Sequence, residues 1–325
     1  MRFFNTEGPN RAADHYCLPP LQRWDLDEVL ALIDRKKYFL LHAPRQTGKT
    51  TCMLALMEHL NRTGRYRALY ANIEGAQTAR EDVSRGMAAI CSVLGRSARL
   101  YLQDPGLAEW YRDGGAQVPA EDRLVQLLEH WAASDPRPAV LLLDEVDALM
   151  GDTLIAVLRQ LRAGYPQRPG AFPQTVILCG VRDLRDYRIH ARSEASPITG
   201  GSAFNIKAES LRLGDFTQVE INALLHEHTT ETGQAFTPDA LALAWDLTQG
   251  QPWLINALAY HACFRMHEAR DRTRPITVDL IGQAKEYLIQ NRVTHLDQLA
   301  YKLLEKRVRQ VIEPMLAGTA LDDVP

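Results

Sequence analysis

The stretch "HAPRQTGKT" at residues 42–50 has residue types at a spacing that could bind phosphate. The pattern of a phosphate-binding loop is G-x-x-x-x-G-K-[S/T], and this stretch departs from it only at Ala43, in the place of the first glycine. In such a loop Gly48 would let the backbone approach the ligand, Lys49 would reach the β and γ phosphates, and the Thr50 hydroxyl would bind Mg²⁺. The first position mainly shapes the turn, so alanine costs little there unless φ must be positive.

A second stretch, "AVLLLDEVDAL" at residues 139–149, places two carboxylates at the end of an apolar run. Adjacent carboxylates at the end of a buried strand favour a bound cation. In P-loop NTPases the first carboxylate supports Mg²⁺ and an adjacent glutamate polarises the attacking water. Asp144 is therefore predicted to hold the metal with Thr50, and Glu145 to be catalytic. The alternative is that Asp144 caps a helix starting at Val146.

Both motifs occur in order in one chain, which favours a nucleotide site over an ordinary strand-to-helix turn. The predicted cofactor-binding residues of the loop are Ala43, Pro44, Arg45, Gln46, Thr47, Gly48, Lys49, Thr50 and Thr51.

Short apolar runs that alternate with longer amphipathic segments predict the elements that position these residues, a parallel sheet flanked by helices. Three helices, near 79–95, 96–112 and 121–133, would form an insertion on one side of the sheet. The predicted strands cover residues 37–43, 67–73, 139–145 and 175–181, with 204–213 as a candidate edge strand.

The order of these strands fits the additional-strand class of P-loop ATPases, in which the fourth strand lies between the loop strand and the acidic strand. The tip of the fourth strand would then point at the γ-phosphate. Arg182, in "GVRD", is a candidate γ-phosphate sensor and is predicted to be catalytic, because guanidinium binds phosphate bidentately. The alternative is a solvated arginine. Asn72, at the end of the second strand, is expected to neighbour Glu145 in the sheet. It would either hold the side chain of Glu145 in an inactive rotamer or be a strand-end asparagine whose hydrogen bonds are satisfied locally.

Strand signals stop after Leu213, and helix caps follow. Thr217 to Glu220 reads as a capping box, and Gly233 can close that helix. The remaining helix starts are Thr237-Pro238 (with an end at Gly250), Pro252, Thr277 and Thr294. The predicted domains are a nucleotide-binding α/β domain at 1–212, a helical lid at 213–275 and a C-terminal helical segment at 276–325.

The motifs "HAPRQTGKTT", "LLLDEVDAL", "ILCGVRD" and "TQGQPWLINALA" together resemble bacterial and archaeal AAA-like P-loop ATPases close to the STAND class, a group that includes the archaeal ATPase family. The resemblance covers roughly residues 20–265 and implies an arginine at the position of Arg182. It also implies that Pro252, in the G-x-P run Gly250 to Pro252, lies near the adenine, and that the helical lid closes over the nucleotide.

The chain departs from these relatives at Ala43, and it has no clear arginine finger, with Arg159 and Arg162 as the candidates. Relatives commonly continue into a winged helix and sometimes a nuclease domain. Residues 276–325 are therefore expected to be the start of a truncated winged helix, or else the effector lies on another protein.

Composition bounds the other classes. The 325 residues hold 37 Lys and Arg against 40 Asp and Glu, so no overall basic charge indicates a nucleic-acid binder. Five scattered cysteines indicate neither a disulfide framework nor a zinc site, and no apolar run is long enough to span a membrane. A cytoplasmic protein is expected.

The predicted function is Mg²⁺-dependent ATP binding and hydrolysis, with slow turnover, by an ATPase that acts as a conformational switch. The alternative is a regulatory module that binds nucleotide with little or no turnover. The expected ligands are ATP or ADP and Mg²⁺. A homo-oligomer, and DNA or an effector protein reached through a further C-terminal domain, are candidate partners that the residues leave open.

Overall fold

The computed structural model describes residues 1–181 and 209–291 of the chain. These residues form two compact units, one of Leu18–Asp215 and one of Met1–Cys17 together with the chain from Phe216 onward. The first seventeen residues, which the sequence places in the α/β domain, thus belong to the same unit as the C-terminal helices. Each unit is described by itself below.

The unit of Leu18–Asp215 is an α/β structure. Its strands are β1 (Phe39–His42), β2 (Arg67–Asn72), β3 (Ala139–Asp144), β4 (Thr175–Gly180) and β5 (Glu209–Arg212). Its α-helices are α1 (Leu26–Asp34), α2 (Lys49–Thr63), α3 (Val83–Leu102), α4 (Gly106–Arg112), α5 (Ala120–Ala133) and α6 (Gly151–Ala163).

The described strands form one five-stranded sheet in the order β2-β3-β4-β1-β5, and all pairs are parallel. The fourth strand lies between the loop strand β1 and the acidic strand β3, and β5 lies at the edge, as the sequence predicts. Ala139 to Asp144 are all buried, as are Thr175 to Gly180, which explains their near-continuous apolar sequence. The predicted P-loop NTPase fold of the additional-strand class is confirmed.

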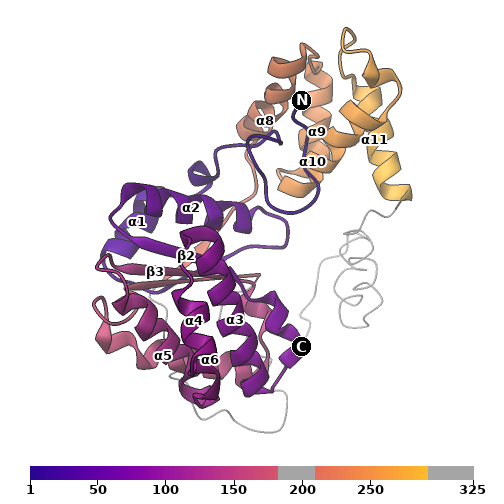
Figure 1. Cartoon of the computed structure of the whole chain (residues 1–325). Coiled ribbons are helices and arrows are strands. Elements are labelled where there is room, and N and C mark those ends of the chain that lie inside the picture. Colours follow the sequence, from indigo (N-terminus) through magenta and orange to yellow (C-terminus); the bar gives the residue numbers. More distant parts are fainter. Residues whose placement is uncertain (182–208, 292–325) are drawn as a thin grey trace, which may run out of the picture. The chain divides into compact units, whose positions relative to one another are not determined.

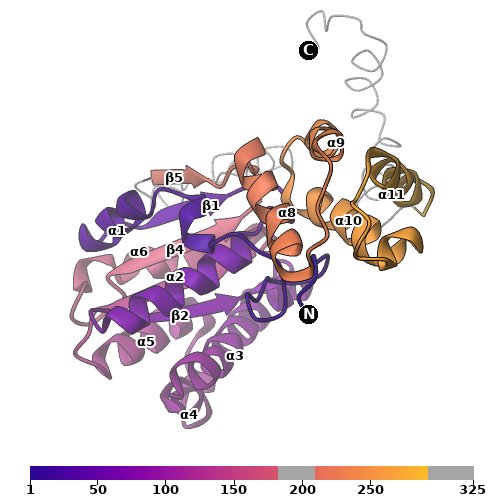
Figure 2. The ribbon, with the colours of Figure 1, turned by 90° about the horizontal axis from the view of Figure 1, so that it is seen from above.

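Helices cover both faces of this sheet (Figures 1 and 2). On one face α1 and α2 bury residues such as Met53 and Leu56 against alternate strand residues, including Leu41 and Leu142. On the other face, α3, α5 and α6 pack over the strand residues that alternate with those of the first face, such as Leu141. The segment between β2 and β3 is therefore an insertion on one side of the sheet, as predicted.

The predicted break between helices at residues 95 and 96 is wrong. Helix α3 runs unbroken to Leu102, and α4 begins only at Gly106. Gly95 is buried inside α3, where a Cβ would lie 3.1 Å from the Cα of Ala108 in α4. The glycine permits close packing of two helices and does not end the first one.

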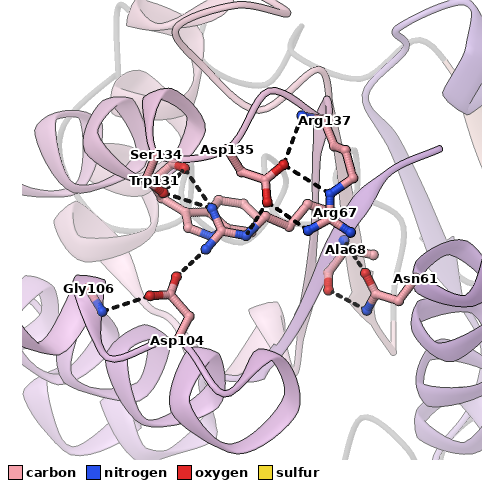
Figure 3. A network of polar contacts seen from close by, with 9 residues as sticks. All are labelled: Asn61, Arg67, Ala68, Asp104, Gly106, Trp131, Ser134, Asp135 and Arg137. Carbon is pink, nitrogen blue, oxygen red and sulfur yellow. Dashed lines mark hydrogen bonds and ion pairs between the residues drawn. The ribbon is translucent and has the colours of Figure 1, made fainter. Parts of the chain in front are cut away.

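A buried arginine joins the insertion to the beginning of β2 (Figure 3). Arg67 is 7% exposed, pairs with Asp104 after α3 and with Asp135 after α5, and lies over the ring of Trp131 at 5.6 Å. Its Nη1 also donates to the hydroxyl of Ser134 at 2.7 Å. Because a buried guanidinium needs such partners, Arg67 ties both loops to the end of the sheet opposite the carboxyl ends of the strands.

The other unit is helical. Its α-helices are α8 (Gln218–Thr232), α9 (Pro238–Thr248), α10 (Pro252–Tyr260) and α11 (Val278–Gln290). The capping box of Thr217 and Glu220 is present, and Gly233 ends α8 in the left-handed conformation. Thr237 caps α9, whose first residue is Pro238. These predictions are confirmed, whereas the helix predicted from Thr294 lies outside the described residues.

The turn before α10 requires glycine. Gly250 has a φ of 85°, and a Cβ there would lie 1.9 Å from the carbonyl oxygen of Phe216. The N–H of Phe216 donates to the carbonyl of Gly250 at 2.8 Å. Pro252 begins α10 after the N-cap Gln251, as predicted for a proline that wastes no N–H group.

The N-terminal segment contributes to the core of the helical unit. The side chains of Phe4 and Tyr16 are fully buried, and their rings pack on His228 at 5.9 and 5.6 Å. Arg2 pairs with Glu227 and Glu231 of α8, and the indole of Trp253 donates to the carbonyl of Thr6 at 2.9 Å. Met1–Cys17 is thus part of this unit.

The cysteines are all free, and every one lies in the described part of the chain. Among residues 1–181 and 209–291, no helix combines the length and apolar character needed to cross a membrane.

Candidate functional site

The loop that the sequence predicts to bind phosphate joins β1 to α2. Gly48 has a φ of 91° and is the N-cap of α2, so the first N–H groups of the helix are free of helical partners. Gln46 also has a positive φ, of 61°, whereas Ala43 is not among the residues with positive φ. This explains why alanine is accommodated in place of the first glycine. The loop therefore presents backbone donors at a helix N-terminus, an arrangement that binds anions.

Lys49 lies inside this loop. Its side chain is 6% exposed, and its amine donates to the carbonyl oxygens of Ala43 and Pro44 at 2.9 Å each. The Thr47 hydroxyl donates to the same carbonyl of Pro44 at 2.9 Å. These bonds fold the loop around the lysine, so its positive charge stands at the point where the helix begins.

A hydroxyl–carboxylate contact connects the loop helix with the acidic strand. The Thr50 hydroxyl donates to Oδ2 of Asp144 at 2.7 Å, and Asp144 is fully buried at the end of β3. The N-cap of the turn that follows β3 is Glu145, and no side chain caps that turn. Asp144 is thus turned toward the loop. A hydroxyl and a carboxylate are oxygen ligands of the kind that Mg²⁺ prefers, so these two residues fit a magnesium site.

Glu145 follows Asp144 in a left-handed backbone conformation, with φ 60° and ψ 41°. Its N–H donates to Oδ1 of Asp144 at 2.9 Å. Its side chain is half-buried, and burial raises its pKa, with further contributions from the charges of Asp144 and Asp147. A raised pKa makes the carboxylate a stronger base, as a residue that takes a proton from water requires.

The tip of β4 reaches the same place. The carbonyl of Gly180 accepts a hydrogen bond from the N–H of Ala43 at 3.3 Å, which joins this tip to the loop. The Asp147 carboxylate accepts from the N–H of Val181 at 3.0 Å, and a Cβ on Gly180 would lie 2.7 Å from the same oxygen. Asp147 thus holds the last described residue before Arg182, and the predicted sensor Arg182 itself lies outside the described residues.

The other predicted residues are distributed as follows. Asn72 stands opposite Asp144 in the sheet, and its side chain accepts from the N–H of Glu74 at 2.9 Å, so it is a satisfied strand-end residue in this structure. Arg159 and Arg162 are exposed on α6. Pro252 belongs to the helical unit and is buried there. Within 1–181 and 209–291, no three His, Cys, Asp or Glu side chains form a metal-binding group.

Three residues at the site were assigned no role from the sequence. Arg23, before α1, donates to the carbonyl of Thr47 in the loop at 2.8 Å. Tyr70, on β2, donates to Asp144 at 2.9 Å. Asp147 holds the tip of β4. The acidic residue two places after Glu145 was visible in the sequence, but nothing in the sequence distinguishes Arg23 from other surface arginines or Tyr70 from other strand residues.

Comparison with known proteins agrees with this geometry. Residues 33–187 match the family described as an AAA domain. No curated protein matches the chain.

Solved structures share the fold. A Walker-type ATPase of Pyrococcus abyssi superimposes with a TM-score of 0.59 at 12% identity, over 92% of this chain and 79% of that one. The ORC2 protein of Aeropyrum pernix, solved as ADPNP and ADP complexes, has a TM-score of 0.54 at 14% identity, over 87% of this chain and 70% of that one. Cdc6p of Pyrobaculum aerophilum has a TM-score of 0.51 at 19% identity, over 79% of this chain and 62% of that one.

The family match spans strands β1 to β4, with the loop at the start of α2 and the acidic end of β3. The protein has the α/β fold of a P-loop NTPase, and its residues 33–187 match the AAA domain family.

Proposed function

We propose that this protein binds ATP with Mg²⁺ and hydrolyses it. The single observation that carries the proposal is the contact between the Thr50 hydroxyl and Asp144 at 2.7 Å. These residues are distant in sequence, and they come from the two motifs that a nucleotide–metal site requires. Their contact involves a fully buried carboxylate and lies beside a lysine that begins a helix, and it has no better structural explanation than a phosphate and cation site.

Each residue then has a defined task. The loop from Ala43 to Thr51 would bind the phosphates through its N–H groups, and Lys49 would contact the β and γ phosphates. Thr50 and Asp144 would hold Mg²⁺, which when bound neutralises charge on the phosphate oxygens. Glu145 would orient water and accept its proton. Arg182 would sense the γ-phosphate, a role that rests on its position after β4.

We further propose that hydrolysis serves a conformational switch of the STAND-like kind. The chain passes between its two units at two places, after Cys17 and after Asp215. Pro252, by resemblance, would contact the adenine, so bound nucleotide would link the helical unit to the loop. A homo-oligomer, and DNA or an effector protein, are the candidate partners of such a switch.

A second candidate is a module that holds nucleotide with little turnover. The observation in its favour is the half-buried position of Glu145, where burial and the charges of Asp144 and Asp147 favour the neutral acid. At a given pH, a raised pKa lowers the fraction of Glu145 that is ionised and able to accept a proton from water, which would slow hydrolysis.

One pair of measurements tests the proposal. Equilibrium titration with a fluorescent ATP analogue should show binding that Mg²⁺ strengthens and that Lys49→Ala weakens, without loss of the folded state. Single-turnover hydrolysis should fall by about 10²–10⁴ in Glu145→Gln, while binding is retained.

The outcomes separate the candidates. Affinity that is the same in wild type and Lys49→Ala would refute the site. Tight binding by a wild-type protein that shows no hydrolysis would favour the nucleotide-holding module.

A further inference from the structure

A tyrosine on the neighbouring strand shares the buried carboxylate of the candidate metal site. Tyr70 is 5% exposed and lies on the face of the sheet that α1 and α2 cover. Its register partner on β3 is Leu142, so Asp144 lies two residues further along the same strand and points to the same face. Aromatic side chains can span this diagonal distance, and the Tyr70 hydroxyl does so at 2.9 Å from Oδ2.

The hydrogen bonds of Asp144 are divided between its two oxygens. Oδ2 accepts from the hydroxyls of Thr50 and Tyr70, and Oδ1 accepts from the N–H of Glu145. Asp144 is therefore held from the loop helix, from the adjacent strand β2 and from its own backbone.

The hydroxyl of Tyr70 is more than a packing group. A phenylalanine would fill the same volume, and a buried hydroxyl costs free energy unless it is hydrogen-bonded. The ring is held from the side by Tyr101, whose centroid is 6.0 Å away at an angle of 84°. A carboxylate can only accept, so the phenol O–H is the donor in this bond.

We propose that Tyr70 is a positioning residue for the metal site: its hydroxyl holds Oδ2 of Asp144 beside Thr50, in the orientation that a magnesium–nucleotide complex uses. The inference rests on the proposed function and deepens it. With one lone pair of Oδ2 bound by Tyr70 and another by Thr50, the carboxylate cannot rotate freely about χ2. The free-energy cost of orienting the carboxylate therefore falls on folding and not on the binding of the cation.

The test uses Tyr70→Phe, which removes the hydroxyl and keeps the ring. The affinity for a fluorescent ADP or ATP analogue is measured as a function of Mg²⁺ concentration and in EDTA. The Mg²⁺ concentration at half-effect should rise about tenfold, the lower end of what a hydrogen bond to a charged group contributes. The affinity in EDTA should stay at the wild-type value, because the Tyr70 hydroxyl binds Asp144 and not the loop that binds the phosphates.

Tyr38→Phe is the matched control. The Tyr38 side chain is 1% exposed, and its hydroxyl donates to the carbonyl of Pro173 at 3.1 Å, on the opposite face of the same sheet. Each variant loses one buried tyrosine hydroxyl, so a general loss of stability would affect both. Only Tyr70→Phe should change the Mg²⁺ dependence. Tyr70→Leu should show the same change in Mg²⁺ dependence with a greater loss of thermal stability, since it also loses the ring.

The outcomes distinguish this inference from the proposed function. If wild type binds nucleotide and responds to Mg²⁺, but Tyr70→Phe has the same Mg²⁺ dependence as Tyr38→Phe, the positioning role is wrong and the site stands. A wild type that binds nucleotide equally well with Mg²⁺ and with EDTA overturns the inference together with the proposed metal site. A wild type that binds no nucleotide overturns the proposed function itself.

Discussion

The guanidinium of Arg23 donates to the carbonyl oxygen of Thr47 inside the phosphate-binding loop at 2.8 Å. Its other terminal nitrogen donates to the carbonyl of Gly214 at 2.6 Å, one residue before the α/β unit ends at Asp215. A Cβ on Gly48 would lie 3.1 Å from the same guanidinium, so the arginine packs directly against the turn that begins α2. One side chain therefore connects the loop to the segment that leads into the helical unit.

Arg23→Ala should weaken the binding of ATP and ADP alike, by about three- to tenfold, because the loop loses a charged donor to its backbone. The Mg²⁺ dependence should stay unchanged, since Thr50 and Asp144 keep their contact. Titration with fluorescent analogues measures both quantities. Arg65→Ala is the control, because Arg65 pairs with Asp34 on the exposed surface. Wild-type affinity in Arg23→Ala would show that the hydrogen bonds of Arg23 to Thr47 and Gly214 have no part in nucleotide binding.

Arg182→Ala should separate ATP from ADP. A guanidinium that binds the γ-phosphate has no partner in the diphosphate, so ATP affinity or turnover should fall while ADP affinity stays nearly level. Competition titrations of both nucleotides on the same preparation provide the comparison. Equal losses for the two nucleotides would mean that Arg182 supports the structure and does not sense the third phosphate.

Pro252→Ala should give the opposite pattern. If Pro252 contacts the adenine, which ATP and ADP share, both affinities should fall together. Bound nucleotide would then also protect α8, α9 and α10 from hydrogen exchange, because a ligand stabilises the states that bind it. The competing result is a change in thermal stability with unaltered affinity and no added protection on ADP binding, as expected of a proline that only begins a helix.

Phe4→Ala should destabilise the helical unit by about 3–5 kcal/mol, the usual cost of emptying a fully buried phenylalanine site. Phe3→Ala, at the adjacent position, should cost about 1 kcal/mol or less, because Phe3 is 37% exposed. Urea unfolding measures the two free energies, and hydrogen exchange of α8 and α10 shows which unit has loosened. Similar costs for the two variants would contradict the role of Met1–Cys17 as part of the helical core.

His228 should make the helical unit sensitive to mild acid. Burial lowers the pKa of His228 in the folded protein, and the charge of Arg272 lowers it further. Below about pH 6.5 the unfolded chain binds a proton that the folded chain refuses, so the free energy of unfolding decreases as pH falls from there toward the lowered folded pKa. The slope for one proton is at most about 1.4 kcal/mol per pH unit.

His228→Phe should reduce this slope in urea unfolding measured between pH 7.5 and pH 5, in roughly half-unit steps. Burial also lowers the pKa of His15 and His261 in the same unit, so part of the slope should remain. His226→Ala is the control, because His226 lies two residues away on the exposed side of α8 and should leave the slope in place. A slope in His228→Phe as steep as that of the wild type would show that His228 does not contribute to the acid sensitivity.

Much of the sheet and of the loop could be read from the sequence because their signals are local. A run of apolar residues, a glycine before a lysine and a hydroxyl, or a threonine three places before a glutamate, acts within one or two turns of chain. The strand order was also within reach, since strands joined by helices pair in parallel and the acidic strand and loop strand leave a place between them.

The contacts that complete the site depend on which strands become neighbours and in what register. Tyr70 pairs with Leu142 on β3, two residues before Asp144, so the tyrosine and the aspartate lie on the same face of the sheet. A register shift of one residue would turn the tyrosine to the other face. Gly95 reads as a helix end, yet it lies in mid-helix because α4 packs against it.

The positions of the N-terminal segment and of Arg23 also depend on which parts of the chain become neighbours in the fold. The sequence alone determined the loop, the acidic strand and the helix caps. Tertiary structure alone decided that Met1–Cys17 joins the C-terminal helices and that Arg23 binds Thr47. Hydrophobic burial is non-directional, so it favours any arrangement that removes Phe4 and Tyr16 from water, and only the folded chain shows which surface is available to cover them.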